Sequence, residues 1–173
     1  MKIVFVRHAE AEEKGQGIPG ADEHRKLTKS GQREARAVGR VLNSLKMRPA
    51  MIFTSPLVRA RQTAEILQGQ IKRSPDPCDT RALAPEGTWV DLQREIARHG
   101  DLFAGKNPDK IVVFAVGHQP NLGRMITDAL AGRNSGCILQ KGACVALAWK
   151  DDKPQGAAEI LFALTPDQAA VLA

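Results

Sequence analysis

Six consecutive apolar residues, at positions 111–116, are the feature of this sequence that most restricts its fold. A run of this kind, rich in β-branched side chains, is typical of a strand that is buried on both faces, and such strands occur mainly in parallel sheets covered by helices. Shorter runs at residues 2–6 and 50–53 have the same character. Two later runs, at residues 143–149 and 158–164, are also expected to be strands.

Between these runs, apolar residues recur at steps of three and four, which places them on one face of a helix. The two clearest series are Ala35, Val38, Leu42 and Leu45, and Leu57, Ala60, Ala64 and Leu67. Thr28 or Ser30 would cap the first of these helices. Ser55 as N-cap, followed by Pro56 at the first helical position, would begin the second.

Strands that alternate with helices predict an α/β fold with three layers, a mostly parallel central sheet with helices on both faces. The remaining expected elements are a short strand near residues 78–82 and helices at residues 89–97 and 120–130, the second ended by Gly132. The two late strands, joined by a turn at residues 151–154, would form an antiparallel pair at one edge. With 43% hydrophobic and 25% charged residues, positions 1–173 are expected to form a single domain.

The composition argues against several classes of protein. Three scattered cysteines (Cys78, Cys137 and Cys144) do not support a disulfide framework or a zinc knuckle, so we expect reduced thiols in a cytoplasmic protein. The first apolar run is too short for a signal peptide, and no run approaches the ~20 residues of a membrane span. The formal net charge is +6, but the basic residues are dispersed and aromatic residues make up only 4%, so nucleic-acid binding is not expected. The oligomeric state stays open.

Histidines and arginines follow three of the expected strands. Arg7 and His8 come directly after the first strand, and His118 follows the long apolar run. Arg59 lies about one helical turn beyond the second strand. Because α/β proteins bind ligands beyond the carboxyl ends of their parallel strands, we expect these four side chains to meet at one edge of the sheet.

Two arginines and two histidines in one place favour phosphoryl chemistry. Guanidinium groups match the geometry of a phosphoryl group, and their charge repels a metal cation, so neither a metal nor another cofactor is expected. One histidine would be the nucleophile, with its second nitrogen donating to a carbonyl or carboxylate, and the other would donate to phosphoryl oxygens. Taken singly, each residue also has a structural explanation: His8 as a hydrogen-bonded side chain, His118 as a helix cap, and the arginines as surface charges.

The same residues carry a resemblance to a known family. Arg7-His8 after an N-terminal strand resembles the Arg-His-Gly signature of the histidine phosphatase superfamily, whose fold is called phosphoglycerate mutase-like. Residues 55–64, Ser-Pro-Leu-Val-Arg-Ala-Arg-Gln-Thr-Ala, resemble its second motif, and Gly117-His118 its third. Ala9 replaces the usual glycine after the histidine. The resemblance extends over nearly the whole chain.

Further segments are similar to those of the phosphohistidine phosphatase SixA branch. They are Asp22-x-x-Arg25-x-Leu27-Thr28-x-x-Gly31, Leu83-Ala84-Pro85-Glu86-Gly87 and Gly117-His118-Gln119-Pro120. The resemblance implies that His8 becomes phosphorylated during turnover, while Arg7, Arg59 and His118 hold the phosphoryl oxygens. It also implies a phosphorylated substrate, which for this branch is a phosphohistidine on a protein. Lys26 replaces the usual proline of the first segment.

The resemblance identifies no general acid in this chain, although larger members of the superfamily carry a carboxylate for that role. Glu86 and Asp22 are the candidates. An imidazole leaves phosphorus more easily than an alkoxide does, so a phosphohistidine phosphatase has less need of an acid. Two alternatives stay open: a phosphatase for small phosphomonoesters that uses the same site, and a non-catalytic phosphate-binding regulatory module.

Overall fold

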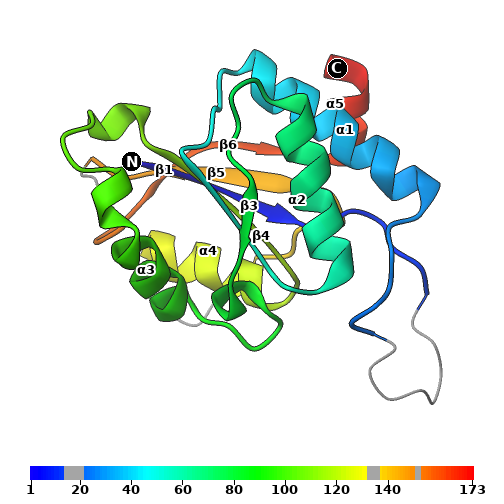
Figure 1. The fold of residues 1–173 in the computed structure, drawn as a ribbon, viewed down its shortest axis with the longest axis horizontal. Coiled ribbons are helices and arrows are strands. Elements are labelled where there is room, and N and C mark those ends of the chain that lie inside the picture. The colour runs from blue at the N-terminus through cyan, green and yellow to red at the C-terminus, as the bar shows by residue number, and fades with distance from the viewer. Residues whose placement is uncertain (14–21, 132–136, 151–152) are drawn as a thin grey trace.

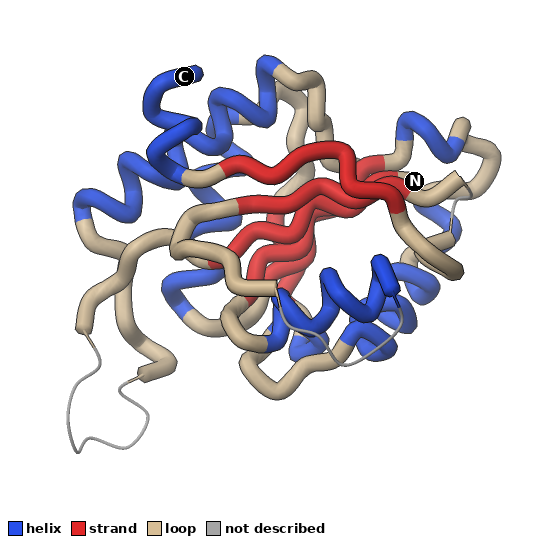
Figure 2. Tube along the Cα trace, turned by 180° about the vertical axis from the view of Figure 1, so that it is seen from behind, coloured by secondary structure: helices blue, strands red, loops and turns tan. Residues whose placement is uncertain are grey.

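A computed structural model describes residues 1–13, 22–131, 137–150 and 153–173. Its six-stranded sheet lies between two layers of helices, which Figures 1 and 2 show from opposite sides. In chain order the main elements are β1 (Lys2–Arg7), α1 (Lys29–Ser44), β2 (Met51–Thr54), α2 (Val58–Gln70), β3 (Pro77–Asp79), α3 (Trp89–Arg98), β4 (Val112–Gly117), α4 (Asn121–Ala131), β5 (Cys144–Ala148), β6 (Glu159–Leu164) and α5 (Pro166–Leu172). Short 3₁₀ turns follow β3 (Arg81–Leu83) and α3 (Gly100–Leu102) and precede β4 (Pro108–Lys110).

The sheet has the strand order β3-β2-β4-β1-β5-β6. Strands β3, β2, β4 and β1 run parallel to one another, whereas β5 pairs antiparallel with β1 and with β6. This arrangement confirms the predicted three-layer α/β fold, with a mostly parallel sheet and an antiparallel pair at one edge.

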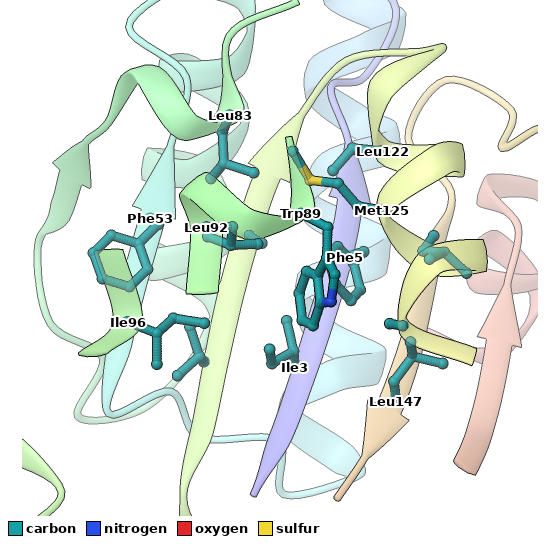
Figure 3. Packing of buried hydrophobic residues seen from close by; sticks show 14 of the residues in the cluster. Ile3, Phe5, Phe53, Leu83, Trp89, Leu92, Ile96, Leu122, Met125 and Leu147 are labelled. Carbon is teal, nitrogen blue, oxygen red and sulfur yellow. The ribbon is translucent and has the colours of Figure 1, made fainter. Parts of the chain in front are cut away.

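Alternation along the strands fills both faces of the sheet. In β1, Ile3 and Phe5 lie in the apolar cluster under α3 and α4, while Val4 and Val6 lie in the cluster under α1, α2 and α5. The ring of Trp89 in α3 packs 6.0 Å from that of Phe5, centroid to centroid, inside the first cluster (Figure 3). Each fully buried side chain of this size stabilises the fold by roughly 1.5–3 kcal/mol.

The register of the parallel strands brings their carboxyl ends to one level. Arg7 at the end of β1 pairs with Gly117 at the end of β4, and Thr54 at the end of β2 pairs with Val116. The chain then leaves each strand at the same edge. His8, the first residue after β1, still donates its backbone N–H to the carbonyl of Gly117, at 3.0 Å.

Two local predictions need correction. Helix α2 begins at Val58, and its N-cap residue is Leu57 without a side-chain cap, so the prediction that Ser55 caps this helix was wrong. The short strand β3 covers Pro77–Asp79 only. At the first helix the prediction is confirmed, because the Thr28 hydroxyl caps α1 by accepting a hydrogen bond from the backbone N–H of Gly31.

Gly132 and positions 151–152 of the predicted turn lie outside the described residues. Within the residues that the structure does describe, no helix combines the length and apolar character needed to cross a bilayer. Cys78, Cys137 and Cys144 are free thiols, and burial raises the pKa of Cys144 to about 12.

Candidate active site

The two strand-end histidines lie side by side. His8 follows β1 and His118 follows β4, and their ring centroids are 5.1 Å apart, with the ring planes inclined at 54°. Both side chains are buried. The parallel register of β1 and β4 therefore brings together two residues that are far apart in the sequence.

The contacts of the His8 ring define its tautomer. Its Nε2 lies 3.3 Å from Nε of Arg59, and its Nδ1 lies 2.8 Å from the carbonyl oxygen of Ala9. Because an arginine Nε–H only donates, Nε2 of His8 accepts this bond and carries no proton. The proton of the neutral ring is then on Nδ1 and is donated to the carbonyl of Ala9. This is the kind of partner that a nucleophilic histidine needs.

Burial keeps the His8 ring uncharged. It lowers the pKa of His8 from 6.5 to about 4, against the opposing effect of the hydrogen bond to Ala9. The positive charges of Arg59, Arg7 and Arg25 contribute to this lowering. At neutral pH, Nε2 therefore presents a lone pair in a cationic environment.

His118 is neutral as well but is held differently. Its Nε2 lies 2.8 Å from the hydroxyl oxygen of Ser55, and its buried Nδ1 has no hydrogen-bond partner among the described residues. Burial, followed by the electrostatic effects of His8 and Arg59, lowers the pKa of His118 to about 3.

Arg59 is fixed by Asp22. One terminal nitrogen of its guanidinium donates to the Asp22 backbone carbonyl at 2.6 Å, and the other lies 3.1 Å from the Asp22 carboxylate. Arg25 binds the second carboxylate oxygen of Asp22 at 2.8 Å. Burial lowers the pKa of Arg59, while Asp22 raises it. A carboxylate shared between two guanidinium groups is suited to positioning Arg59 rather than to giving up a proton.

Arg7 reaches the site from the end of β1. Its terminal nitrogen donates to the carbonyl of Leu139 at 2.7 Å, and its Nε is buried without a partner among the described residues. The charge of Arg7 is close enough to lower the pKa of His8. Arg7 thus leaves a donor available for an anion near the two histidines.

Glu86, the second candidate acid, lies on the exposed stretch after the 3₁₀ turn at Arg81–Leu83. Among the described residues, no hydrogen bond or ion pair joins Glu86 to His8, Arg59 or His118. The structure therefore places Arg59 and His118 against the His8 ring, adds the charge of Arg7, and pairs Asp22 with Arg59.

Residues that the sequence analysis did not assign to the site complete it. The Thr63 hydroxyl donates to the backbone carbonyl of Arg59 at 2.7 Å and accepts the backbone N–H of Ala9 at 3.2 Å, which ties α2 to the loop after His8. Arg25 and Ser55 contribute through the contacts given above. The signal that could have found them was their presence in the motifs: polar side chains at fixed positions among apolar ones.

The donor set of this site suits an anion. Among the described residues, no group of three or more histidine, cysteine, aspartate or glutamate side chains could hold a metal ion. The electrostatic field at His8 comes from three arginines, whose planar N–H groups match phosphoryl oxygens.

Comparisons with known proteins agree with this chemistry. Residues 3–105 match the sequence profile of the histidine phosphatase superfamily (branch 1). The chain is 36% identical over 123 residues to an uncharacterised protein of Picosynechococcus sp., covering 71% of this chain and 69% of that one. It is 34% identical over 92 residues to phosphoglycerate mutase 1 of Saccharomyces cerevisiae, covering 53% of this chain and 37% of the mutase. The solved structure of the protein histidine phosphatase SixA complexed with tungstate superimposes with a TM-score of 0.78 at 18% identity, covering 96% of this chain and 98% of that one.

Proposed function

Since the chain belongs to the histidine phosphatase superfamily (branch 1) and is a phosphatase, we propose that it acts through a phosphorylated His8 and removes phosphate from phosphohistidine on another protein. Residues 1–173 would act as one domain. The observation that carries the proposal is the state of the His8 ring: Nδ1–H donates to a backbone carbonyl, while the unprotonated Nε2 faces Arg59.

In the first step, Nε2 of His8 attacks phosphorus in line with the leaving group. The bond from Nε2 to phosphorus forms, and the bond from phosphorus to the substrate imidazole breaks, with its electron pair passing to the leaving ring. Arg7 and Arg59 neutralise the charge on the phosphoryl oxygens, and His118 adds a hydrogen bond.

The Ala9 carbonyl makes the intermediate reactive. Because Nδ1 of His8 keeps its proton, phosphorylation of Nε2 gives a positively charged ring, whose proton stays hydrogen-bonded to Ala9. In the second step a water oxygen bonds to phosphorus, and the Nε2–phosphorus bond breaks. His8 returns as a neutral imidazole, and both protons of the water leave with the phosphate.

The choice of phosphohistidine as the proposed substrate is based on the chemistry of its leaving group. Phosphohistidine protonated on its second ring nitrogen releases a neutral imidazole, so this step needs little help from an acid. Asp22 is occupied by two arginines, which favours a positioning role for it. Glu86 stays the candidate acid for an alkyl phosphate, whose alkoxide must be protonated as it leaves.

A labelling experiment tests the intermediate. A short reaction with ³²P-phosphohistidine protein, stopped in alkali, should leave acid-labile, alkali-stable label on the wild-type protein and none on His8→Ala. Turnover should survive EDTA, because the arginines supply the positive charge. A fully active His8→Ala protein, or loss of turnover on chelation, would refute the mechanism. Absence of any label together with tight phosphate binding would favour the regulatory-module alternative.

A substrate panel tests the proposed class. We expect kcat/KM for a phosphohistidine protein to exceed the values for sugar phosphates and other small phosphomonoesters. The reverse order would favour the small-molecule phosphatase on the same site while leaving the His8 mechanism intact.

A further inference from the structure

Ser55 occupies the site but is not an N-cap. It is fully buried after β2, and its hydroxyl oxygen lies 2.8 Å from Nε2 of His118, a residue 63 positions away in the sequence. The same oxygen accepts the backbone N–H of Leu57 at 3.3 Å. One lone pair of the Ser55 oxygen therefore accepts this hydrogen bond, and the hydroxyl proton is still available for another acceptor.

Because the His118 ring is neutral at physiological pH, one of its two ring nitrogens carries a proton and the other does not. If the proton were on Nε2, the lone pair of Nδ1 would be left buried beside a site built for an anion. The Ser55 proton would then lack an acceptor at His118. If the proton is on Nδ1, the Ser55 hydroxyl donates to Nε2. The Nδ1–H is then available to donate to a phosphoryl oxygen.

We propose that Ser55 is a positioning residue that donates its hydroxyl proton to Nε2 of His118 and so holds this histidine as the Nδ1–H tautomer, an uncharged hydrogen-bond donor to the phosphoryl group. The part that concerns the phosphoryl group rests on the proposed function. In the free protein this Nδ1–H has no partner among the described residues, and substrate supplies one.

An uncharged donor fits the surroundings of His118. Its ring lies 5.1 Å from that of His8, whose nucleophilic nitrogen must keep its lone pair. Three arginines already provide positive charge around His8. A neutral N–H adds direction to phosphate binding without a further buried charge, which would be costly beside these cations.

The tautomer can be measured without substrate. In ¹⁵N-histidine-labelled protein at pH 7, NMR should show a protonated Nδ1 and an unprotonated Nε2 for His118, with the signals assigned by their loss in His118→Gln. In Ser55→Ala the ring should lose this preference, and kcat/KM should fall by about tenfold, the value of one hydrogen bond. Ser55→Thr keeps a hydroxyl and should restore the Nδ1–H tautomer.

The matched control is Thr54→Val, which removes a neighbouring buried hydroxyl that donates to the Ser55 carbonyl and makes no hydrogen bond to His118. Its His118 signals should match those of the wild type. A protonated Nε2 on His118 in the wild-type protein overturns the proposal, even if Ser55→Ala fails to fold. An unchanged tautomer in a folded Ser55→Ala protein overturns it too. The expected tautomer in a protein without phosphatase activity would support the role of Ser55 and refute the proposed function instead.

Discussion

His8 and His118 hold equivalent positions at the ends of neighbouring parallel strands, yet their rings are held in opposite ways. His8 uses Nδ1 for a backbone carbonyl and turns Nε2 to Arg59, while His118 uses Nε2 for the Ser55 hydroxyl and keeps Nδ1 without a partner. Burial makes both neutral. Position in the sheet therefore brings a histidine to the site, and the partners of its two nitrogens decide its chemistry.

Replacing each histidine in turn tests this comparison most strongly. His8→Ala removes the nucleophile and should lower kcat by roughly 10⁴-fold or more. His118→Ala removes one donor to the phosphoryl oxygens and should cost about 10²–10³-fold. Steady-state kinetics and phosphate trapping on both variants measure the difference, and equal losses would mean that the two rings do not have separate roles.

Asp22 affects His8 through Arg59, which it holds beside the His8 ring. Asp22→Asn weakens the grip on Arg59 and should lower kcat/KM by about 10²-fold, the scale expected for a misplaced substrate-binding group. Asp79→Asn is a matched control, because Asp79 pairs with Arg61, a more exposed arginine of the helix α2 that also carries Arg59. Full activity in Asp22→Asn, or an equal loss in both variants, would contradict a positioning role at Arg59.

The dependence of stability on pH tests the property that His8 and His118 share, which is that burial keeps both rings neutral. Their pKa values in the folded protein, about 4 and about 3, lie below the ordinary 6.5, so the unfolded chain binds protons first as the pH falls. Stability is thus highest above pH 6.5 and decreases toward pH 4, by about 1.4 kcal/mol per pH unit for each histidine.

Urea unfolding between pH 7 and 4 measures this slope. His118→Gln should remove the share of this slope that belongs to His118. A slope that is the same in wild type and His118→Gln would show that His118 is not held neutral by the fold.

Glu86 should matter least. Glu86→Gln is expected to leave turnover of phosphohistidine within about twofold, because the imidazole leaves without an acid, and to slow only alkyl phosphates. Comparing the two substrates in one preparation provides the internal control. A large loss on phosphohistidine would place Glu86 beside the two histidines as a third proton-handling residue.

The sequence predicted the elements wherever periodicity was strong and failed where a polar residue had two possible uses. The apolar run at residues 111–116 led to a central strand, and the Thr28 cap was correct because its partner lies three residues away. Ser55 followed the same pattern of a hydroxyl before a helix. It serves His118 instead, and nothing local to Ser55 indicates that choice.

The candidate site, like the secondary structure, could be predicted only in part. Strand-end residues could be listed because parallel strands share one carboxyl edge, and His8, Arg59 and His118 do lie together. The different contacts of the two candidate acids could not be predicted. Asp22 and Glu86 are both carboxylates in recognisable segments, and only the tertiary structure shows that Asp22 pairs with Arg59.

By itself, the sequence determined the layered α/β architecture and which cationic and imidazole side chains reach one edge of the sheet, since both follow from periodicities of a few residues. Only the tertiary structure decided which nitrogen of each histidine is free. Proton placement depends on partners such as Ser55 and Arg59, brought within 3.3 Å by packing between distant segments. Contacts at that scale follow from the packed core as a whole rather than from any local pattern.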